Sequence, residues 1–210
     1  MTYYYIYFSI LIIGLIIGFT RIKSLNRSSR ILLLLLALTI LSESVATYLK
    51  FSARNNIIVY HIFSPIEFAL ISALYYNEIK NKIILVLMII FISFACFNSI
   101  NIQYFNTDFN SISFVISGLL TIIFSLWYLY LLILEKTHYN FTNYPLFWIS
   151  VGFMFFNIIN LFILGTYNLI ALKFPEVGFL FRSIRFISNY SLYLFFTISF
   201  LCSQKSLDEV

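Results

Sequence analysis

Charged residues are scarce in this chain, and their scarcity excludes a soluble globular fold. Only 10% of the 210 residues are Asp, Glu, Lys or Arg, whereas 61% are hydrophobic. The mean hydropathy is +0.95. A soluble domain carries roughly 25% charged residues, and no soluble core of this length hides so much apolar surface. The lipid bilayer is therefore the expected solvent for most of the side chains.

Cysteine is scarce as well, with Cys96 and Cys202 on separate apolar runs. Two cysteines are too few for a disulfide scaffold, and their spacing matches no metal motif. We therefore expect no metal and no cofactor. The net charge of +5 does not indicate nucleic-acid binding, because the basic residues lie in short loops beside apolar runs, where they set membrane orientation.

Seven apolar runs follow one another along the chain, and each is close to the roughly 20 residues that cross a hydrocarbon core. They cover residues 3–20, 31–49, 57–77, 83–102, 113–134, 145–165 and 177–202. The first run lacks a basic segment before it, so we interpret it as a retained helix rather than a signal peptide. The pattern predicts an all-α, seven-transmembrane-helix bundle that forms a single transmembrane domain over residues 1–210.

Lysine and arginine are distributed unequally between alternate loops. One side of the predicted bundle holds Arg21, Lys23, Arg27, Arg30, Lys80, Lys82, Lys136 and Lys205. The other side holds only Lys50, Arg54 and Lys173. Cytoplasmic loops carry the excess of positive charge, so the N-terminus is predicted outside and the C-terminus in the cytoplasm. The amino-acid usage resembles that of an AT-rich bacterial genome, which favours a multi-pass protein of the bacterial inner membrane.

The loops between the runs are short, and we expect no catalytic or signalling domain on either face. The longest loops, near residues 99–112 and 166–176, both fall on the predicted outer side. Any activity is therefore expected within the bilayer or through a partner.

Four ionisable residues, Glu43, Glu67, Arg182 and Arg185, lie inside the predicted spans, where charged groups are costly and usually face the bundle interior. Polar residues accompany them at helical spacing. Together they give the candidate ligand-binding residues Glu43, Tyr60, His61, Ser64, Glu67, Asn157, Asn160, Arg182, Arg185 and Asn189. In the predicted orientation these residues lie between the midplane and the outer surface, and the inner half is nearly free of such groups. The arrangement predicts a polar pocket that opens outward.

Helix packing is an alternative explanation for the same residues. A glutamate could pair with an arginine only to hold helices together, and the arginines could extend to the outer headgroups. His61, near the outer end of its span, could equally have a surface or capping role. Pro65 removes a backbone donor and predicts a kink in the span 57–77, which could open a cavity or only accommodate packing.

One short motif resembles a known group of proteins. The motif consists of His61, Ser64, Pro65, Ile66, Glu67 and Phe68, and it follows the acidic Glu43 of the preceding span. It resembles uncharacterised seven-span membrane proteins from Bacteroidota, which implies no settled activity.

Three better-known families agree less well. Microbial rhodopsins bind retinal through a lysine of the seventh helix, and the span 177–202 contains no lysine. SWEET-type sugar transporters share the seven spans and a three-one-three plan, but the chain lacks their proline–glutamine signature. Membrane lycopene cyclases of the two-subunit type carry proline-x-glutamate motifs, and Phe68 stands where these have a second acidic residue.

Three function hypotheses follow. The first is a receptor-like or sensory protein that binds a small polar or anionic ligand, because arginine donates two parallel hydrogen bonds to a carboxylate or phosphate, and that signals through a cytoplasmic partner such as a histidine kinase. The second is a small-solute transporter with a three-one-three helix plan. The third is an intramembrane enzyme acting on a lipid or isoprenoid with Glu43 and Glu67 as acid and base; the sequence favours a function without catalysis.

Overall fold

The computed structural model describes residues 2–135, 140–170 and 175–202, and within these ranges it contains helices and no strand. The α-helices are α1 (Thr2–Thr20), α2 (Arg27–Phe51), α3 (Ile57–Ile79), α4 (Ile83–Asn101), α5 (Ser111–Glu135), α6 (Pro145–Ile170) and α7 (Pro175–Leu201), with a short 3-10 helix η1 (Phe141–Asn143) before α6. All seven α-helices in the described part of the chain are long and apolar enough to cross a membrane. The prediction of an all-α chain with seven such helices is confirmed.

The helices agree with the predicted spans except at a few ends. The second helix begins at Arg27 rather than at residue 31, and in its first turn Ser28 and Ser29 are buried and Ser28 is hydrogen-bonded to Glu78. The third helix continues through Pro65 without ending. The sixth continues to Ile170, beyond the expected end at residue 165.

The helices divide into two compact units, each described here by itself. Unit 2 is the continuous segment Arg27–Ser117 and holds α2, α3, α4 and the first turns of α5. Unit 1 is discontinuous and combines Met1–Asn26 with Gly118–Val210. It holds α1, the rest of α5, η1, α6 and α7. The single-domain interpretation of the chain stays a prediction.

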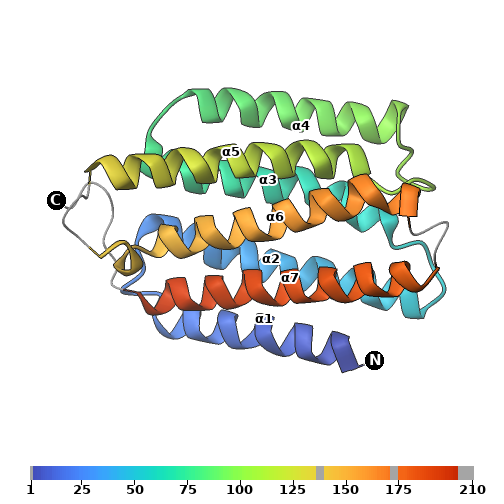
Figure 1. Ribbon diagram of the computed structural model, residues 1–210, viewed down its shortest axis with the longest axis horizontal. Helices are drawn as coiled ribbons and strands as arrows, with labels where there is room; N and C mark the ends of the chain where they lie inside the picture. The colour runs from blue at the N-terminus through green and yellow to red at the C-terminus, as the bar shows by residue number, and fades with distance from the viewer. Residues whose placement is uncertain (1, 136–139, 171–174, 203–210) are drawn as a thin grey trace. The chain divides into compact units, whose positions relative to one another are not determined.

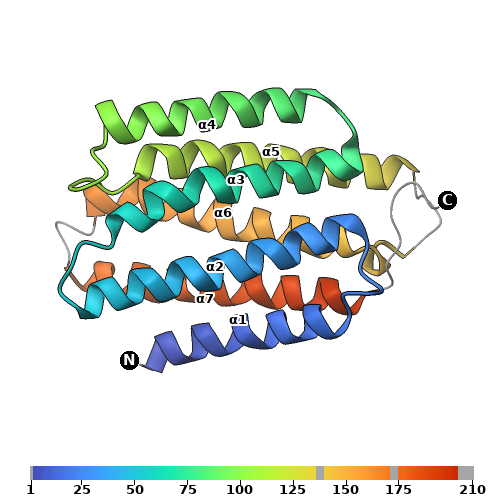
Figure 2. The same cartoon turned by 180° about the vertical axis from the view of Figure 1, so that it is seen from behind.

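In unit 2, α3 lies between α2 and α4 (Figure 2). Buried residues recur every seven positions on both sides of the α3–α4 contact: His61, Phe68 and Tyr75 on α3, and Ile84, Phe91 and Asn98 on α4. The rings of Phe68 and Phe91 lie 4.3 Å apart at its centre. Residues seven apart lie on one side of a helix, so the two antiparallel helices meet along a narrow seam that is apolar in the middle and polar at one end.

In unit 1, α1 and α7 run parallel and side by side (Figure 1). Near the start of α1, the Tyr3 ring stacks on Phe186 at 5.3 Å, and the hydroxyl groups of Tyr7 and Tyr193 lie 3.4 Å apart. Just after the end of α1, the Arg21 guanidinium donates to the carbonyl of Leu201 at 2.9 Å. The contacts follow the same order along both helices, as expected for two odd-numbered crossings of one membrane.

The α6–α7 contact depends on a close approach at Gly152. A Cβ atom at Gly152 would lie 3.0 Å from Cβ of Phe195. One residue further along, the rings of Phe153 and Phe196 meet edge to face at 5.2 Å. Small residues that admit a neighbouring helix are typical of helix pairs in membranes, where packing replaces the hydrophobic effect as the driving force.

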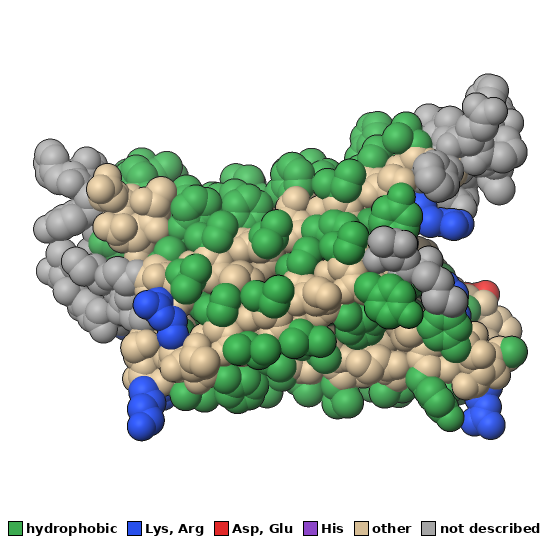
Figure 3. Space-filling model, turned by 90° about the horizontal axis from the view of Figure 1, so that it is seen from below, with side chains coloured by type: hydrophobic (Ala, Val, Ile, Leu, Met, Phe, Trp, Pro, Cys, Tyr) green, Lys and Arg blue, Asp and Glu red, His purple; other side chains and the backbone are tan. Residues whose placement is uncertain are grey.

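The surface matches a lipid-facing chain on the side shown in Figure 3. Hydrophobic side chains cover the lengths of the helices, and Lys and Arg side chains lie near the helix ends. The exposed hydrophobic residues include Ile13 and Ile16 on α1 and Ile89 and Ile90 on α4. Such exposure would be a liability in water and is ordinary against acyl chains.

We predict that Gly152→Ala destabilises the protein by about 1–3 kcal/mol, because the added methyl group meets a Cβ atom that moves only with its backbone. Gly178→Ala is the matched control: a Cβ at Gly178, also within a helix, meets no atom within 4 Å, so its melting temperature should stay or rise. Thermal unfolding in detergent measures both. Equal melting temperatures for the two variants would contradict the close approach.

Candidate functional site

The ten predicted site residues divide between the two units. Unit 2 holds Glu43, Tyr60, His61, Ser64 and Glu67, and unit 1 holds Asn157, Asn160, Arg182, Arg185 and Asn189. The convergence of each set is therefore described within its own unit.

Glu43 and Glu67 come close together within unit 2. Both side chains are half-buried, and the charge of Glu43 acts on the carboxyl group of Glu67 between α2 and α3. Pro65 lies two residues before Glu67 on α3. The proximity of two carboxylates inside apolar helices is what both the pocket and the enzyme hypotheses require.

His61 is buried and links α3 to α4 and to the loop that follows α4. Its Nε2 lies 2.8 Å from the carbonyl oxygen of Asp108 and therefore donates to it. Its Nδ1 lies 2.8 Å from Ser99 Oγ, whose hydroxyl is also 2.8 Å from the carbonyl of Ala95. Beside it, the Tyr60 ring meets Phe109 of the same loop at 6.3 Å. His61 thus holds this loop against the helices.

A network of amide and hydroxyl side chains that the sequence did not single out lies next to His61. It consists of Asn98, Gln103, Asn110, Ser111 and Ser113, and we call it the α4–α5 network. Nδ2 of Asn98 lies 3.0 Å from both Gln103 Oε1 and Asn110 Oδ1, and 3.1 Å from Ser113 Oγ. Nε2 of Gln103 donates to Ser111 Oγ at 2.7 Å. The sequence signal was the density of Asn, Gln and Ser between residues 98 and 113, which we had assigned to an ordinary outer loop.

A second polar cluster, which the sequence did not single out, lies at the opposite end of unit 2. Ser28 Oγ donates to Glu78 Oε1 at 2.5 Å, and Asn77 Nδ2 donates to Ser28 Oγ at 2.8 Å. Ser28 and Glu78 are 1% and 8% exposed, so buried polar side chains also lie at this end of unit 2. Both residues fall just outside the predicted spans. A carboxylate beside the first turn of α2 is also favoured by the positive end of the helix dipole.

The two asparagines of α6 mainly serve packing. Asn157 Nδ2 and Asn160 Nδ2 each donate at 2.8 Å to a carbonyl four residues earlier on their own helix. Asn160 Nδ2 also lies 3.4 Å from Ser188 Oγ of α7. A Cβ at Gly118 of α5 would lie 3.0 Å from Asn157 Oδ1. These amides therefore lie at helix contacts within unit 1.

The arginines of α7 have exposed side chains. Arg182 and Arg185 lie one turn apart near the start of the helix. Asn189 Nδ2 donates to the carbonyl of Arg185 at 2.8 Å, so this amide satisfies the backbone of its own helix. Exposed guanidinium groups at this position suit either an anionic solute or lipid headgroups.

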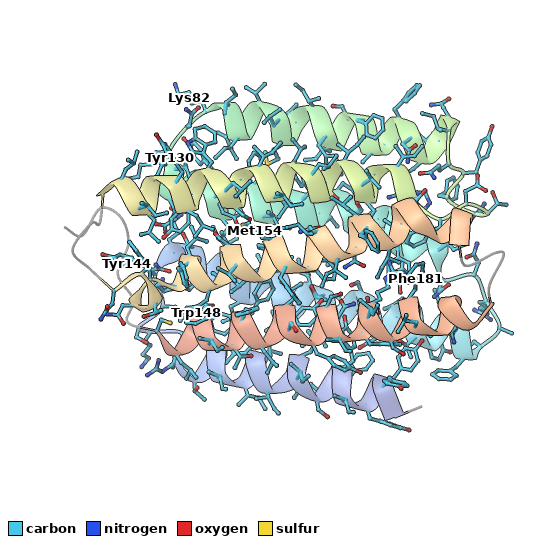
Figure 4. All side chains as sticks on the ribbon, viewed as in Figure 1. Lys82, Tyr130, Tyr144, Trp148, Met154 and Phe181 are labelled. Atoms are coloured by element: carbon cyan, nitrogen blue, oxygen red, sulfur yellow. The ribbon has the colours of Figure 1, made fainter. Side chains whose placement is uncertain are left out.

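The other end of unit 1 carries polar and aromatic residues around the start of α6 (Figure 4). Trp148 donates its indole N–H to the carbonyl of Thr142 at 2.9 Å, and its ring stacks on Phe195 at 5.9 Å. The thiol of Cys202 lies 3.4 Å from the same carbonyl. Burial raises the pKa of that thiol, although Trp148 and Arg21 act in the opposite direction. Trp and Tyr at helix ends are typical of a membrane–water interface.

Neither metal chemistry nor similarity to known proteins adds to this picture. Within the described residues, no three His, Cys, Asp or Glu side chains are grouped so that they could hold a metal ion. No protein-family model, curated protein or solved structure matches the chain. The resemblance to seven-span proteins of Bacteroidota stays a prediction.

We predict that His61→Leu releases the loop between α4 and α5. The variant removes two hydrogen bonds of 2.8 Å, so the loop amides of Thr107 and Asp108 should exchange with solvent about tenfold faster, since each bond is worth about 1 kcal/mol. Hydrogen–deuterium exchange in detergent measures this. In Asn101→Leu, which removes only a bond to the helix's own Phe97 carbonyl, the loop should exchange as in the wild type. Unchanged protection in His61→Leu would contradict the role assigned to the histidine.

Proposed function

We propose that this chain is a multi-pass protein of the bacterial inner membrane, with its N-terminus outside and its C-terminus in the cytoplasm. The distribution of exposed cations supports this orientation. Within unit 2, Arg27, Arg30, Lys80 and Lys82 are exposed at one end, and only Lys50 and Arg54 at the other. The richer end faces the cytoplasm under the positive-inside rule.

We propose a receptor-like or sensory role, in which the protein binds a small polar or anionic ligand on its outer side. The observation that carries this role is the gathering of polar side chains at the predicted outer end of unit 2. There His61 and the α4–α5 network bring buried hydrogen-bonding groups under one loop, and Glu43 and Glu67 lie deeper between α2 and α3. Apolar helices need no such groups for packing alone, and intramembrane polar groups usually mark function.

An anionic ligand would engage the arginines of α7. The guanidinium groups of Arg182 and Arg185 are exposed near the predicted outer end of that helix. From these arginines α7 runs to the opposite end of unit 1, where Arg21 donates to the carbonyls of Phe200 and Leu201 at the end of α7. A helix shift that starts at the arginines would travel along a paired, parallel α1–α7 element to the cytoplasmic side. A signalling partner on that side would respond to this shift.

We predict that phosphate or acetate raises the melting temperature of the purified protein above that in chloride of equal ionic strength, and that Arg185→Gln abolishes the rise without lowering stability in chloride. The reason is the loss of a bidentate, charge-assisted contact. Arg54→Gln, which removes an exposed cation in unit 2, is the matched control and should keep the rise. If phosphate or acetate raised the melting temperature of Arg185→Gln as much as that of the wild type, the proposal of an anionic ligand would be wrong.

Transport is the second candidate, and the cluster of Ser28, Asn77 and Glu78 favours it. Glu67 and Glu78 are eleven residues apart and so lie on nearly the same side of α3. Between them, Ile71 and Leu74 are 5% and 0% exposed. Two polar stations separated by a buried apolar segment suit a solute path that is closed in this conformation.

Labelling at position 67 separates the two candidates. In a Cys96→Ser, Cys202→Ser background, Glu67→Cys should resist a membrane-impermeant maleimide added from the cytoplasmic face if the protein is a receptor with a site that opens outward. Labelling from both faces would instead support alternating access. Tyr48 is exposed near the C-terminal end of α2, on the predicted outer side. Tyr48→Cys is therefore the control, because it should be labelled only when the reagent has reached the outer face.

A further inference from the structure

Two buried carboxamides face one another in the α4–α5 network. Asn98, near the end of α4, is 0% exposed, and Asn110, just before α5, is 3% exposed. Nδ2 of Asn98 donates to Oδ1 of Asn110 at 3.0 Å. Two carboxamides can exchange two such bonds, and here one is formed.

The complementary pair of atoms is unused. Asn98 Oδ1, an acceptor, and Asn110 Nδ2, a donor, are both buried without a hydrogen-bond partner in the described part of the chain. Buried polar groups are almost always satisfied, and an exception needs a cause such as a bound molecule.

Flipping the side-chain amides, which exchanges their oxygen and nitrogen positions, does not give Asn98 and Asn110 the missing hydrogen bonds. The backbone N–H of Ile112 donates to Gln103 Oε1 at 3.1 Å, which fixes that atom as an oxygen. Gln103 Oε1 lies 3.0 Å from the amide end of Asn98, which must therefore be its NH2 group. Asn98 in turn fixes the oxygen of Asn110. Each assignment follows from a backbone donor whose identity is certain.

The free atoms define the chemistry of a ligand. It must donate to Asn98 Oδ1 and accept from Asn110 Nδ2, as a hydroxyl or a carboxamide group does. A carboxylate cannot donate, and an ammonium group cannot accept. The nearest ionisable groups are already engaged: His61 with Ser99 and the Asp108 carbonyl, and Asp108 Oδ2 with the backbone N–H of Tyr104 at 3.0 Å.

We propose that Asn98 and Asn110 form a binding site for the uncharged hydroxyl or carboxamide group of a small solute. The site rests on the proposed receptor role and narrows its ligand to one with a neutral hydrogen-bonding group. The loop of residues 102–110 covers it, and most of its side chains are exposed. His61 holds this loop at Asp108, and Asn55 Nδ2 donates to the carbonyl of Asn106. We infer that the solute enters past this loop, and that these two contacts open to admit it.

Nuclear magnetic resonance of the asparagine side chains tests the site in the full-length chain. With 15N-asparagine labelling, the Nδ2 signal of Asn110 should shift saturably on titration with acetamide or glycerol, and should stay in place with acetate or methylammonium. Asn110→Asp keeps an oxygen that accepts from Asn98 and replaces the unused donor with a charged carboxylate oxygen that cannot donate, so the affinity for acetamide should fall about tenfold. Asn101→Asp introduces the same charge at an exposed asparagine of α4, the helix that carries Asn98, and should bind as the wild type does.

A second variant covers the case in which Asn110→Asp does not fold. His61→Leu leaves both carboxamides intact and opens the cover, so acetamide should bind at the same Asn110 signal with a faster on-rate. No saturable shift up to 100 mM acetamide or glycerol in the wild type would overturn the proposal, as would a shift of equal size with acetate, or a long-lived water at Asn110 that neither probe displaces. If phosphate still stabilises the protein through Arg185 but acetamide does not shift the Asn110 signal, the Asn98–Asn110 site is wrong and the proposed receptor role stands.

Discussion

One constraint bears on the polar side chains of helices that are apolar enough to cross a membrane: hydrocarbon offers no partner for a hydrogen-bonding group, so most such groups find one inside the protein. The polar side chains of the helices find hydrogen-bond partners in two ways. Many hydroxyl and amide groups bond a carbonyl of their own helix, as Thr39 does with Leu35 and Asn157 does with Phe153. A smaller set bonds a different element, and these bonds are what fix one helix against another.

In unit 2, bonds of the second kind lie mostly at helix ends. Within unit 2, Ser28 and Glu78 join α2 to α3 at one end, and His61 joins α3 to α4 at the other, while Phe68 and Phe91 fill the seam between. Glu43 and Glu67 are the exception at mid-helix. Hydrogen bonds at the ends set the register, and the apolar middle leaves the helix pair free of polar groups that would cost energy in lipid.

The seven helices and most of their ends could be predicted from hydropathy, because a span of about 20 apolar residues has few alternatives. Partners could not. Periodicity places Glu67 or Asn160 on a face, but it does not name the helix opposite, and it could not predict that Asn160 lies beside Ser188 of α7. Glu78 and Asn98 were overlooked because a polar residue at the edge of a span looks the same whether a loop or a neighbouring helix follows. Their burial depends on contacts across the chain that hydropathy does not encode.

The discontinuity of unit 1 imposes an order on biosynthesis. Unit 2 is one continuous stretch, Arg27–Ser117, so all of its helix pairs can form while later helices are still being made. The partner of α1, in contrast, is α7, which is translated after all the other described helices. Arg21 therefore reaches the carbonyls of Phe200 and Leu201 only after α7 has been made. The α1–α7 pair thus joins two helices that are separated by all the others along the described part of the chain.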